Sequence, residues 1–401
     1  MQQRDTGIDL QSAVKRTRNA RLEERFRNTA QVMENTAFDL ARDGLATDTG
    51  WRGWEPTGLS KRKIIGLWKS GKIADYLVRF YRASCLKPER PLVLADQAGR
   101  AFLLRATTAR FCIDLGIGKE FVKANLKFAK SVAGKEKPKG PDGVRGPHEP
   151  IIVGIHREYS DTPLSTSFEN AHQAETDELA ASESMKRICG FITKLLRARF
   201  PGVALRYQNN ITWHWKHNRI RPKFGLFWNY CFNAMYAGQK RVHCGPHSDS
   251  KNIVGICAVM VYEMEDVTLP EADFDYSKKS WLCIWDAGII IELRPWQVVL
   301  YPSSLMYHFN VDVDAIDIIT TGGERPTREN PASIQGGKDY GRGSVVFFNQ
   351  ATMFHCETGS ATIKVAKSRG HSGATDFVAD VDHSFPVLTQ AEGPISKASK
   401  A

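Results

Sequence analysis

Two histidines and one aspartate have the residue types and spacing of a metal site. His247 and Asp249 are two residues apart, and residues i and i+2 of a β-strand point to the same face of a sheet. A second histidine, His308, follows 59 residues after the aspartate in an apolar run. Two histidines and one carboxylate form the facial triad of non-heme Fe(II) oxygenases, which leaves open positions for a cosubstrate and O₂. We predict that these three residues bind Fe(II) and are catalytic.

An arginine and a serine further along the chain supply what a dicarboxylate cosubstrate needs. Arg342 and Ser344 share one face of the predicted strand GRGSVVFFNQ. The planar guanidinium is suited to bidentate capture of a carboxylate, and the hydroxyl adds a donor. A dicarboxylate such as 2-oxoglutarate could then place one end on the metal and the other on Arg342.

The order H-x-D, then His, then R-x-S resembles the double-stranded β-helix dioxygenases that use Fe(II) and 2-oxoglutarate. Within them it is most similar to the TET/JBP family, which oxidises modified bases in DNA, and particularly to basidiomycete (fungal) TET-like 5-methylcytosine dioxygenases. The resemblance covers about residues 225–352. It implies that Asn252 and Gln350 read a flipped-out base and that Phe348 stacks on it.

The resemblance also implies the chemistry. The cofactors would be Fe(II), 2-oxoglutarate and O₂, with ascorbate as a reductant in vitro. The methyl of 5-methylcytosine would become hydroxymethyl and, in further rounds, formyl and carboxyl. A base oxidised at its methyl must leave the duplex, and a stacking ring with two carboxamides suits a flipped base. Position 350 is Gln where the animal TET enzymes have His.

Asn229, Cys231 and Asn233 share the polar face of one predicted strand. In this superfamily the first core strand lines the cosubstrate pocket, and Asn233 is the residue that we assign to it. His243 lies four residues before His247, so H-C-G-P-H permits a zinc interpretation, although no further ligand cluster supports it.

Other interpretations of the same residues remain open. The iron chemistry could act on N-methyladenine in DNA or RNA and release formaldehyde, alone or beside 5-methylcytosine oxidation. An inactive β-barrel that binds modified DNA is a third function, which the complete set of ligands argues against. A hydroxylase of small molecules or proteins is a fourth. Each single residue also has a structural explanation, such as a core role for Phe348 and a turn role for Asn252.

The element pattern predicts an α+β fold, in which a double-stranded β-helix (jelly-roll) core is flanked by helices and preceded by a basic, mainly helical N-terminal region. Helical spacing occurs in residues 8–44, 59–86 and 174–200, and short strands are expected at 91–94 and 101–104. From residue 203 short β-rich runs alternate with turn signals. These runs are 203–207, 211–215, 226–236, 253–264, 280–285, 289–293, 297–301, 305–311, 343–349 and 362–366.

The expected divisions follow from composition. Residues 1–140 form the basic N-terminal region, a candidate for DNA contact, and a Gly-, Pro- and Lys-rich stretch at 134–148 marks its end. Residues 141–385 form the dioxygenase domain, with an inserted glycine-containing loop at 312–341. Residues 386–401 are expected to be a disordered tail.

Charge is uneven along the chain. Residues 1–140 hold 28 Lys+Arg and 15 Asp+Glu, a net charge of +13, and the remainder holds 27 and 29, a net charge of −2. This favours a polyanionic partner, with DNA first and RNA as an alternative, although a solvated basic face explains it as well. The oligomeric state is left open.

The chain is expected to be intracellular. Its start lacks the apolar segment of a signal peptide, and its most apolar window contains charged residues, so we expect no membrane partner. The eight cysteines include no C-x-x-C pair, which favours free thiols in a reducing compartment. The run 60–63, Ser-Lys-Arg-Lys, suggests nuclear localisation, and a solvated helix start explains it equally well.

Overall fold

The computed structural model describes most of the 401 residues. The described residues are 30–35, 37–44, 61–78, 80–85, 90–132, 148–157, 162–234, 241–264, 274–313, 341–354, 384–385, 387 and 395–397. Most of the inserted loop, the expected strand at 362–366 and residues 8–29 of the expected first helical region lie outside them.

The core is a double-stranded β-helix. Its strands are β7 (Asn229–Ala234), β8 (Cys257–Glu263), β9 (Trp281–Ile284), β10 (Ile289–Ile291), β11 (Val298–Tyr301), β12 (His308–Val311) and β13 (Arg342–Phe348). Four of them pair in the order β11-β8-β13-β7 and three in the order β12-β9-β10, and all these pairings are antiparallel. The chain crosses from one sheet to the other between β8 and β9, between β10 and β11, between β11 and β12, and between β12 and β13, as in a jelly roll. The predicted α+β class and core are confirmed.

Strands from the first half of the chain extend both sheets. They are β1 (Gln31–Glu34), β2 (Tyr81–Ala83), β3 (Leu92–Ala95), β4 (Ala101–Arg105), β5 (Glu149–His156) and β6 (Leu164–Ser165), and β14 (Ile395–Lys397) joins from the other end. The large sheet has the order β14-β1-β3-β4-β11-β8-β13-β7-β5-β6, and the small sheet ends β10-β2. The 386–401 segment, expected to be disordered, thus contributes one described strand, which pairs with β1.

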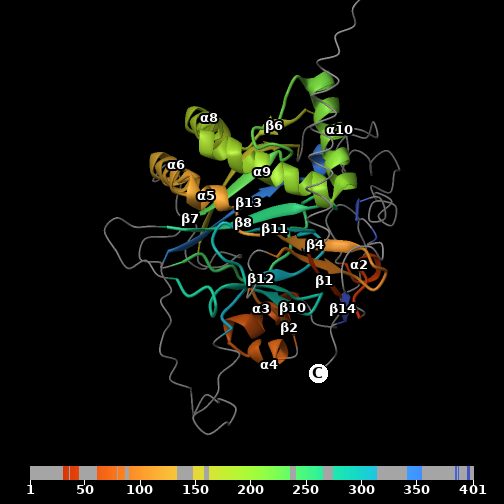
Figure 1. Ribbon diagram of the computed structural model, residues 1–401. Helices are drawn as coiled ribbons and strands as arrows, with labels where there is room; N and C mark the ends of the chain where they lie inside the picture. Colours follow the sequence, from red (N-terminus) through yellow and green to blue (C-terminus); the bar gives the residue numbers. More distant parts are fainter. Residues whose placement is uncertain are drawn as a thin grey trace, which may run out of the picture.

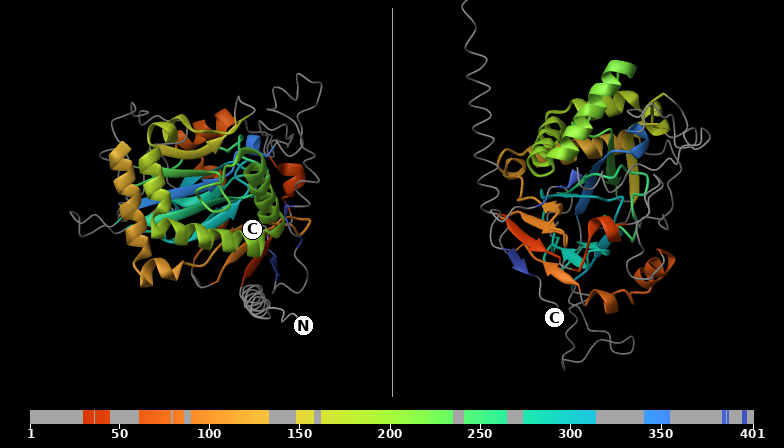
Figure 2. Two further views of the ribbon diagram at one scale, coloured as in Figure 1. Left: turned by 90° about the horizontal axis from the view of Figure 1, so that it is seen from above. Right: turned by 90° about the vertical axis from the view of Figure 1, so that its right-hand side faces the viewer.

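Helices cover the outer faces of both sheets (Figure 1). They are α2 (Leu40–Asp43), α3 (Lys61–Lys69), α4 (Ala74–Leu77), α5 (Arg110–Asp114), α6 (Ile117–Val132), α7 (Ser167–Ala171), α8 (Gln173–Ala181), α9 (Glu183–Arg199) and α10 (Pro201–Asn218), with a 3₁₀ turn, η1 (Ala351–Met353). In Figures 1 and 2 the layer of α6, α8, α9 and α10 lies over the large sheet, while α3 and α4 lie beside the small sheet.

Packing explains these positions. Buried side chains of α9 and α10 belong to the main core together with the large sheet. A second cluster joins Ile64 and Leu77 of the short helices to Trp285 and Phe309 at the small sheet. Burying an apolar side chain of this size stabilises the fold by about 1.5–3 kcal/mol. None of the helices in the described part of the chain is long and apolar enough to cross a bilayer.

Two expectations about secondary structure were wrong. The runs at 203–207 and 211–215 are not strands but parts of α10, which begins with Pro201 at its first turn, a favoured position for proline. Val203, Tyr207 and His214 are buried at helical spacing, and this period outweighs the β propensity of the run. Within the helical regions expected at 8–44 and 59–86, β1 and β2 are strands, because each pairs with a sheet edge.

Candidate metal centre

The sheet pairing brings His247 and His308 together. His247 lies in the segment between β7 and β8, and His308 opens β12. The two residues form an antiparallel bridge, in which the His247 N–H donates to the His308 carbonyl at 3.2 Å and the His308 N–H donates to the His247 carbonyl at 2.8 Å. Their ring centroids are 4.3 Å apart.

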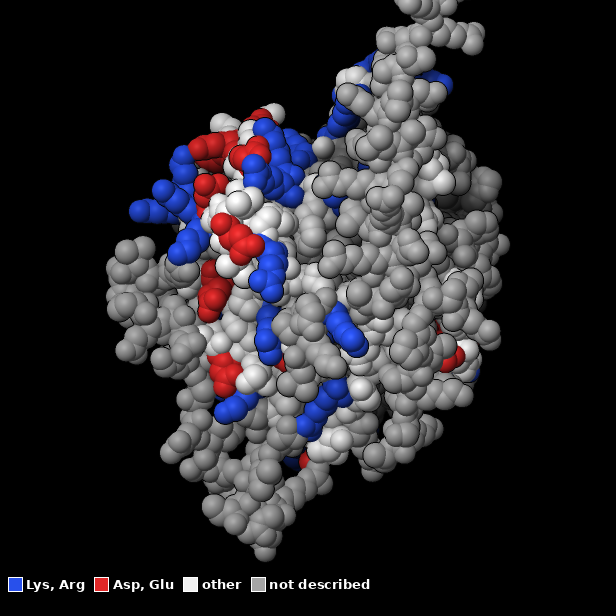
Figure 3. Space-filling model, in the orientation of Figure 1, with Lys and Arg blue, Asp and Glu red and all other residues white. Residues whose placement is uncertain are grey.

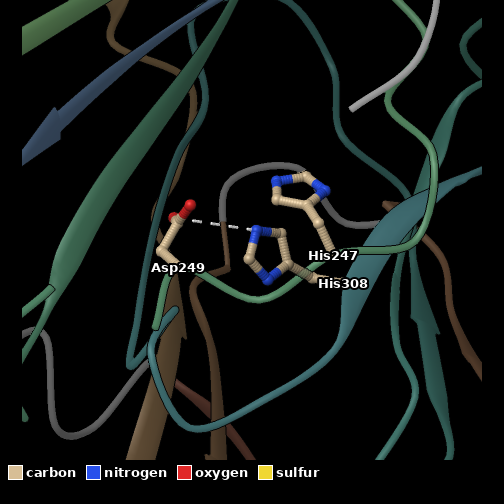
Figure 4. A group of neighbouring side chains, drawn as sticks. All are labelled: His247, Asp249 and His308. Atoms are coloured by element: carbon tan, nitrogen blue, oxygen red, sulfur yellow. Dashed lines mark ion pairs between the residues drawn. The ribbon is translucent and has the colours of Figure 1, made fainter. Parts of the chain in front are cut away.

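Asp249 completes the group from the same segment as His247 (Figure 4). Its backbone N–H donates to the Ser303 carbonyl at 3.0 Å, which fixes the residue beside the turn before β12. Its Oδ2 lies 3.9 Å from Nε2 of His308. The candidate ligand atoms of His247, Asp249 and His308 all lie within 4.8 Å of one another.

Hydrogen bonds hold both imidazoles in the orientation that a metal ligand needs. Nδ1 of His247 lies 2.7 Å from the Gly245 carbonyl, and Nδ1 of His308 lies 3.0 Å from the Met306 carbonyl. A carbonyl can only accept, so each Nδ1 carries the proton and each Nε2 keeps its lone pair. Carbonyl partners of this kind orient metal-binding histidines and fix their tautomer.

The three side chains fit Fe(II). Two neutral imidazoles and one carboxylate are the donor set of non-heme Fe(II) oxygenases. The ligand atoms lie within 4.8 Å of one another, near the limit of about 4.2 Å that two bonds of about 2.1 Å to one cation allow. Fe(II) also needs free coordination positions for a cosubstrate, and the triad faces a cavity of about 370 Å³.

His243 is not part of this group. Its Nδ1 lies 3.2 Å from the Ser280 hydroxyl, and its ring stacks on Trp68 at 5.9 Å. Burial, assisted by the positive charge of Arg241, lowers the pKa of His243 to about 3. The residue is therefore a neutral, half-buried histidine, and among the described residues the only candidate metal group is the triad.

All nine side chains that we predict to contact the metal, the cosubstrate or the base line the same cavity. They are Asn233, His247, Asp249, Asn252, His308, Arg342, Ser344, Phe348 and Gln350. Their roles stay predictions, but residues up to 117 positions apart in the chain converge on one space.

Arg342 brings a buried positive charge to this cavity. Its side chain is 2% exposed, and one guanidinium nitrogen, Nη1, donates to the Val242 carbonyl at 2.8 Å. Among the described residues its Nε has no hydrogen-bond partner, and no carboxylate pairs with the guanidinium. Burial lowers its pKa from the ordinary value, although an arginine stays charged. A buried cation without an acidic partner is costly, so an anion in the cavity would stabilise it.

Ser344 and Asn233 form a polar pair beside this cation. They face each other where β13 pairs with β7, and the Asn233 amide donates to the Ser344 hydroxyl at 3.0 Å. The Cys231 thiol lies 3.3 Å from the Asn233 amide oxygen and also lines the cavity. Asn229, on the same strand face, donates instead to the Ile155 carbonyl at 3.2 Å.

The three candidate base-contacting residues lie together. Asn252 and Gln350 form an antiparallel bridge, so two carboxamides lie side by side at the cavity. The Asn252 amide nitrogen donates to the Ser303 hydroxyl at 3.1 Å, which leaves its oxygen as the acceptor. Phe348 is buried two residues before Gln350, at the end of β13.

Residues outside the motifs also shape the site. Trp68 of α3 donates its indole N–H to the Asn310 carbonyl at 3.3 Å and packs against Gly245. It thus touches both segments that carry the histidines. Tyr301 packs edge-on against His308 with centroids 5.2 Å apart. Nothing in the local sequence marks Trp68 for this position, because the contact depends on how α3 packs on the small sheet.

Comparisons with known proteins give distant structural similarities. Neither a scan against protein-family models nor a search of curated proteins finds a match. NgTET1 in complex with 5mC DNA is similar at 14% identity and a TM-score of 0.41, covering 73% of this chain and 92% of that chain.

Two bacterial structures are similar at lower scores. A 2OG-Fe(II) oxygenase family oxidoreductase from Burkholderia pseudomallei has 9% identity and a TM-score of 0.28, covering 74% of this chain and 93% of that one. A Pseudomonas putida prolyl-4-hydroxylase has 11% identity and a TM-score of 0.25, covering 58% and 86%.

Proposed function

We propose that the protein is an Fe(II)- and 2-oxoglutarate-dependent dioxygenase. One observation carries this proposal: a two-histidine, one-carboxylate group lines the same cavity as a buried arginine that has no acidic partner among the described residues. The group suits Fe(II), and the arginine suits a carboxylate. A dicarboxylate cosubstrate joins the two requirements in one molecule.

The residues of the site then have separate tasks. His247, Asp249 and His308 would hold Fe(II), and Arg342 with the Ser344–Asn233 pair would bind the far carboxylate of 2-oxoglutarate. With O₂, bound Fe(II) and 2-oxoglutarate supply an oxidant that converts a C–H bond to C–OH, while the cosubstrate becomes succinate and CO₂. Apolar neighbours such as Leu282 and Val346 limit water in the cavity.

The proposed substrate is 5-methylcytosine in DNA. A base flipped into the cavity could stack on Phe348, and the Asn252 oxygen, left free by the bond to Ser303, can accept a hydrogen bond from an exocyclic amine. The neighbouring Gln350 offers both a donor and an acceptor. Hydroxymethylcytosine is the first product, and formyl and carboxyl forms would follow from further rounds.

N-methyladenine is a second candidate, because both polar readers are carboxamides. Asn and Gln pair well with adenine edges, and the Asn252–Gln350 bridge places two of them at the cavity. Hydroxylation on nitrogen would release formaldehyde, whereas a methyl bonded to carbon stays on the base. DNA or RNA could carry this base, and nuclear localisation is part of the proposal in either case.

Mass spectrometry of nucleosides tests the proposal. DNA with 5-methylcytosine or N-methyladenine is incubated with the protein, Fe(II), ascorbate and 2-oxoglutarate, beside Asp249→Ala. Oxidised cytosines that are absent with Asp249→Ala would support the first substrate, and loss of methyladenine with formaldehyde would support the second. If wild-type protein converts 2-oxoglutarate but changes neither base, nucleic-acid oxidation is wrong. If it binds methylated DNA without any turnover, the protein is a binding module.

A further inference from the structure

The C-terminal end of α10 presents exposed aromatic and basic side chains outside the cavity. We name the group Trp213, Trp215, Lys216, His217, Arg219 and Arg221 the α10 patch. Trp215 is 41% exposed, and the four basic residues are exposed. In Figure 1 α10 runs upward from the C-terminal end of α9, so the C-terminal end of α10 lies near the top of the view.

The patch lies in a long stretch without acidic residues. Residues 184–248 contain no Asp or Glu. They contain twelve cations, namely Lys186, Arg187, Lys194, Arg197, Arg199, Arg206, Lys216, Arg219, Arg221, Lys223, Lys240 and Arg241. This second basic region is hidden in the sum over residues 141–401, which is slightly negative. Among the coloured side chains visible around the upper end of α10 in Figure 3, the charged ones are blue.

The cations stack on the aromatic rings. The Arg221 guanidinium lies 4.0 Å from the centre of the Trp215 ring, and that of Arg219 lies 5.9 Å from it. His217 stacks on Trp213 with centroids 4.4 Å apart. No carboxylate of the described residues pairs with Lys216, Arg219 or Arg221. A guanidinium stacked on an indole keeps its N–H edges free for phosphate oxygens.

Arg219 has an unfavourable backbone conformation. It ends α10 in the left-handed region with φ 57°, where glycine is the usual residue and a side chain is strained. Its basic neighbours Lys216 and His217 lie in the last turn, where cations stabilise the helix dipole. That explanation accounts for those two residues but not for a strained arginine, since glycine would end the helix better.

A chain of hydrogen bonds connects the helix that carries the patch to the cavity. The Asn210 amide donates to the Met353 carbonyl at 2.9 Å, and Nε2 of His214 lies 2.8 Å from the same oxygen. The Met353 N–H in turn donates to the carbonyl of Gln350, which lines the cavity. The last turn of α10 continues only about 6 Å beyond His214. A ligand that reaches into the cavity can therefore have its flanking part at the patch.

We propose that the α10 patch binds the sugar–phosphate backbone of double-stranded DNA beside the flipped base. This inference rests on the proposed function, because it gives the DNA duplex its second point of contact. Exposed cations that pair with no carboxylate of the described residues, aromatic surfaces, and a run of positions 184–248 without Asp or Glu match a polyanion. The rigid connection to Gln350 makes the contact part of substrate positioning.

Arg219→Gly separates this role from stability. The substitution removes the charge and also relieves the left-handed strain, so its melting temperature should equal or exceed that of the wild type. Binding of a fluorescent 5-methylcytosine duplex, measured by anisotropy, should weaken by roughly threefold to tenfold, and the slope of log K against log salt should fall by about 1. Trp215→Ala with Arg221→Gln should weaken binding further.

A matched control uses an exposed lysine at the other end of the helical layer. Lys127 of α6 is exposed and pairs with Glu178, and Figures 1 and 2 place α6 and α10 apart. Lys127→Gln should leave the dissociation constant and the salt slope unchanged. Equal weakening by Lys127→Gln and Arg219→Gly would show that only total charge matters and would overturn the proposal.

The remaining outcomes separate the patch from the proposed function. If the wild type oxidises duplex DNA and Arg219→Gly binds it equally well, the patch proposal is wrong and the function stands. If the wild type neither binds nor oxidises DNA, both are wrong. If Arg219→Gly instead loses binding to phosphatidylserine vesicles and keeps DNA binding, the patch recognises a membrane surface, which also overturns the proposal.

Discussion

His247 and His308 are hydrogen-bonded to each other through both of their backbone amides. The two N–O distances are 3.2 and 2.8 Å, and the ring centroids are 4.3 Å apart. The register of an antiparallel pair therefore sets the separation of the two proposed ligands before any metal binds. Their Nδ1–H groups are held by carbonyls two residues upstream, so each imidazole is also oriented in advance.

Removing one ligand should abolish tight metal binding without unfolding the protein. In His308→Ala the backbone bridge to His247 can persist, so the circular dichroism spectrum should stay close to that of the wild type. Affinity for Fe(II), or for Mn(II) as an air-stable probe, should fall by roughly 100-fold or more by calorimetry. His243→Gln is the control because His243 is outside the triad, and metal affinity that is lost there but kept in His308→Ala would contradict the assignment.

Arg342→Gln should raise the KM for 2-oxoglutarate. The variant removes the buried charge that has no acidic partner among the described residues, and a charge-assisted bond contributes about 1.5–3 kcal/mol, or roughly 10- to 150-fold in affinity. Arg342→Lys should be intermediate, because lysine keeps the charge but not the planar fork. Steady-state kinetics of succinate formation measure both, and an unchanged KM in Arg342→Gln would remove the residue from the cosubstrate site.

Phe348→Ala should weaken base binding while leaving the iron site intact. Base–aromatic stacking contributes about 1–3 kcal/mol, so kcat/KM for methylated DNA should fall by roughly 5- to 150-fold. Succinate formation without DNA should stay near the wild-type rate, because Arg342 and the triad are untouched. Parallel loss of both activities would instead assign Phe348 to core packing.

Asp286 should make the protein less stable as the pH rises. Burial raises the pKa of this carboxyl from 3.8 to about 8, and its Oδ2 accepts the Tyr307 N–H at 2.6 Å. Between about pH 4 and 8 the folded state holds a proton that the unfolded chain has released, so the free energy of unfolding falls across that window. Asp286→Asn should remove this pH dependence. At pH 8 it should raise the free energy of unfolding by roughly 1 kcal/mol or more.

Thermal unfolding of Asp286→Asn at two pH values checks this sign. The gain in melting temperature should be small near pH 5 and largest near pH 8. The carboxamide oxygen can still accept the Tyr307 N–H, so the hydrogen bond is matched between the two proteins. An equal gain at both pH values would mean that the effect does not come from ionisation.

The sequence predicts the strands of the barrel and which side chains line one cavity, because both depend on local patterns. Strand period and turn residues locate β7 to β13 to within a few residues, and side chains two apart, such as His247 and Asp249, share a face by geometry. The order of the motifs along the chain then implies one cavity. The bridge between Asn252 and Gln350 is a finding of the structure alone.

Features that depend on tertiary packing could not be predicted. The run 203–215 has β-branched and aromatic residues, yet it is helical because one face packs on the large sheet and Asn210 caps η1 through Met353. The position of Trp68 against Gly245 has no local signal. The net charge of residues 141–401 also conceals the stretch 184–248, which has no Asp or Glu. Acidic residues elsewhere in 141–401 cancel its positive charge in the sum.

The N-terminal strands occupy the edges of the jelly roll. β4 pairs with β11 at one side of the large sheet, and β2 pairs with β10 at the end of the small sheet. A shortened protein beginning at residue 141 would leave β11 and β10 with unpaired backbone N–H and C=O groups. Open strand edges of this kind favour pairing between molecules. We expect the shortened protein to aggregate. The N-terminal strands would then prevent self-association by covering the edges of the barrel.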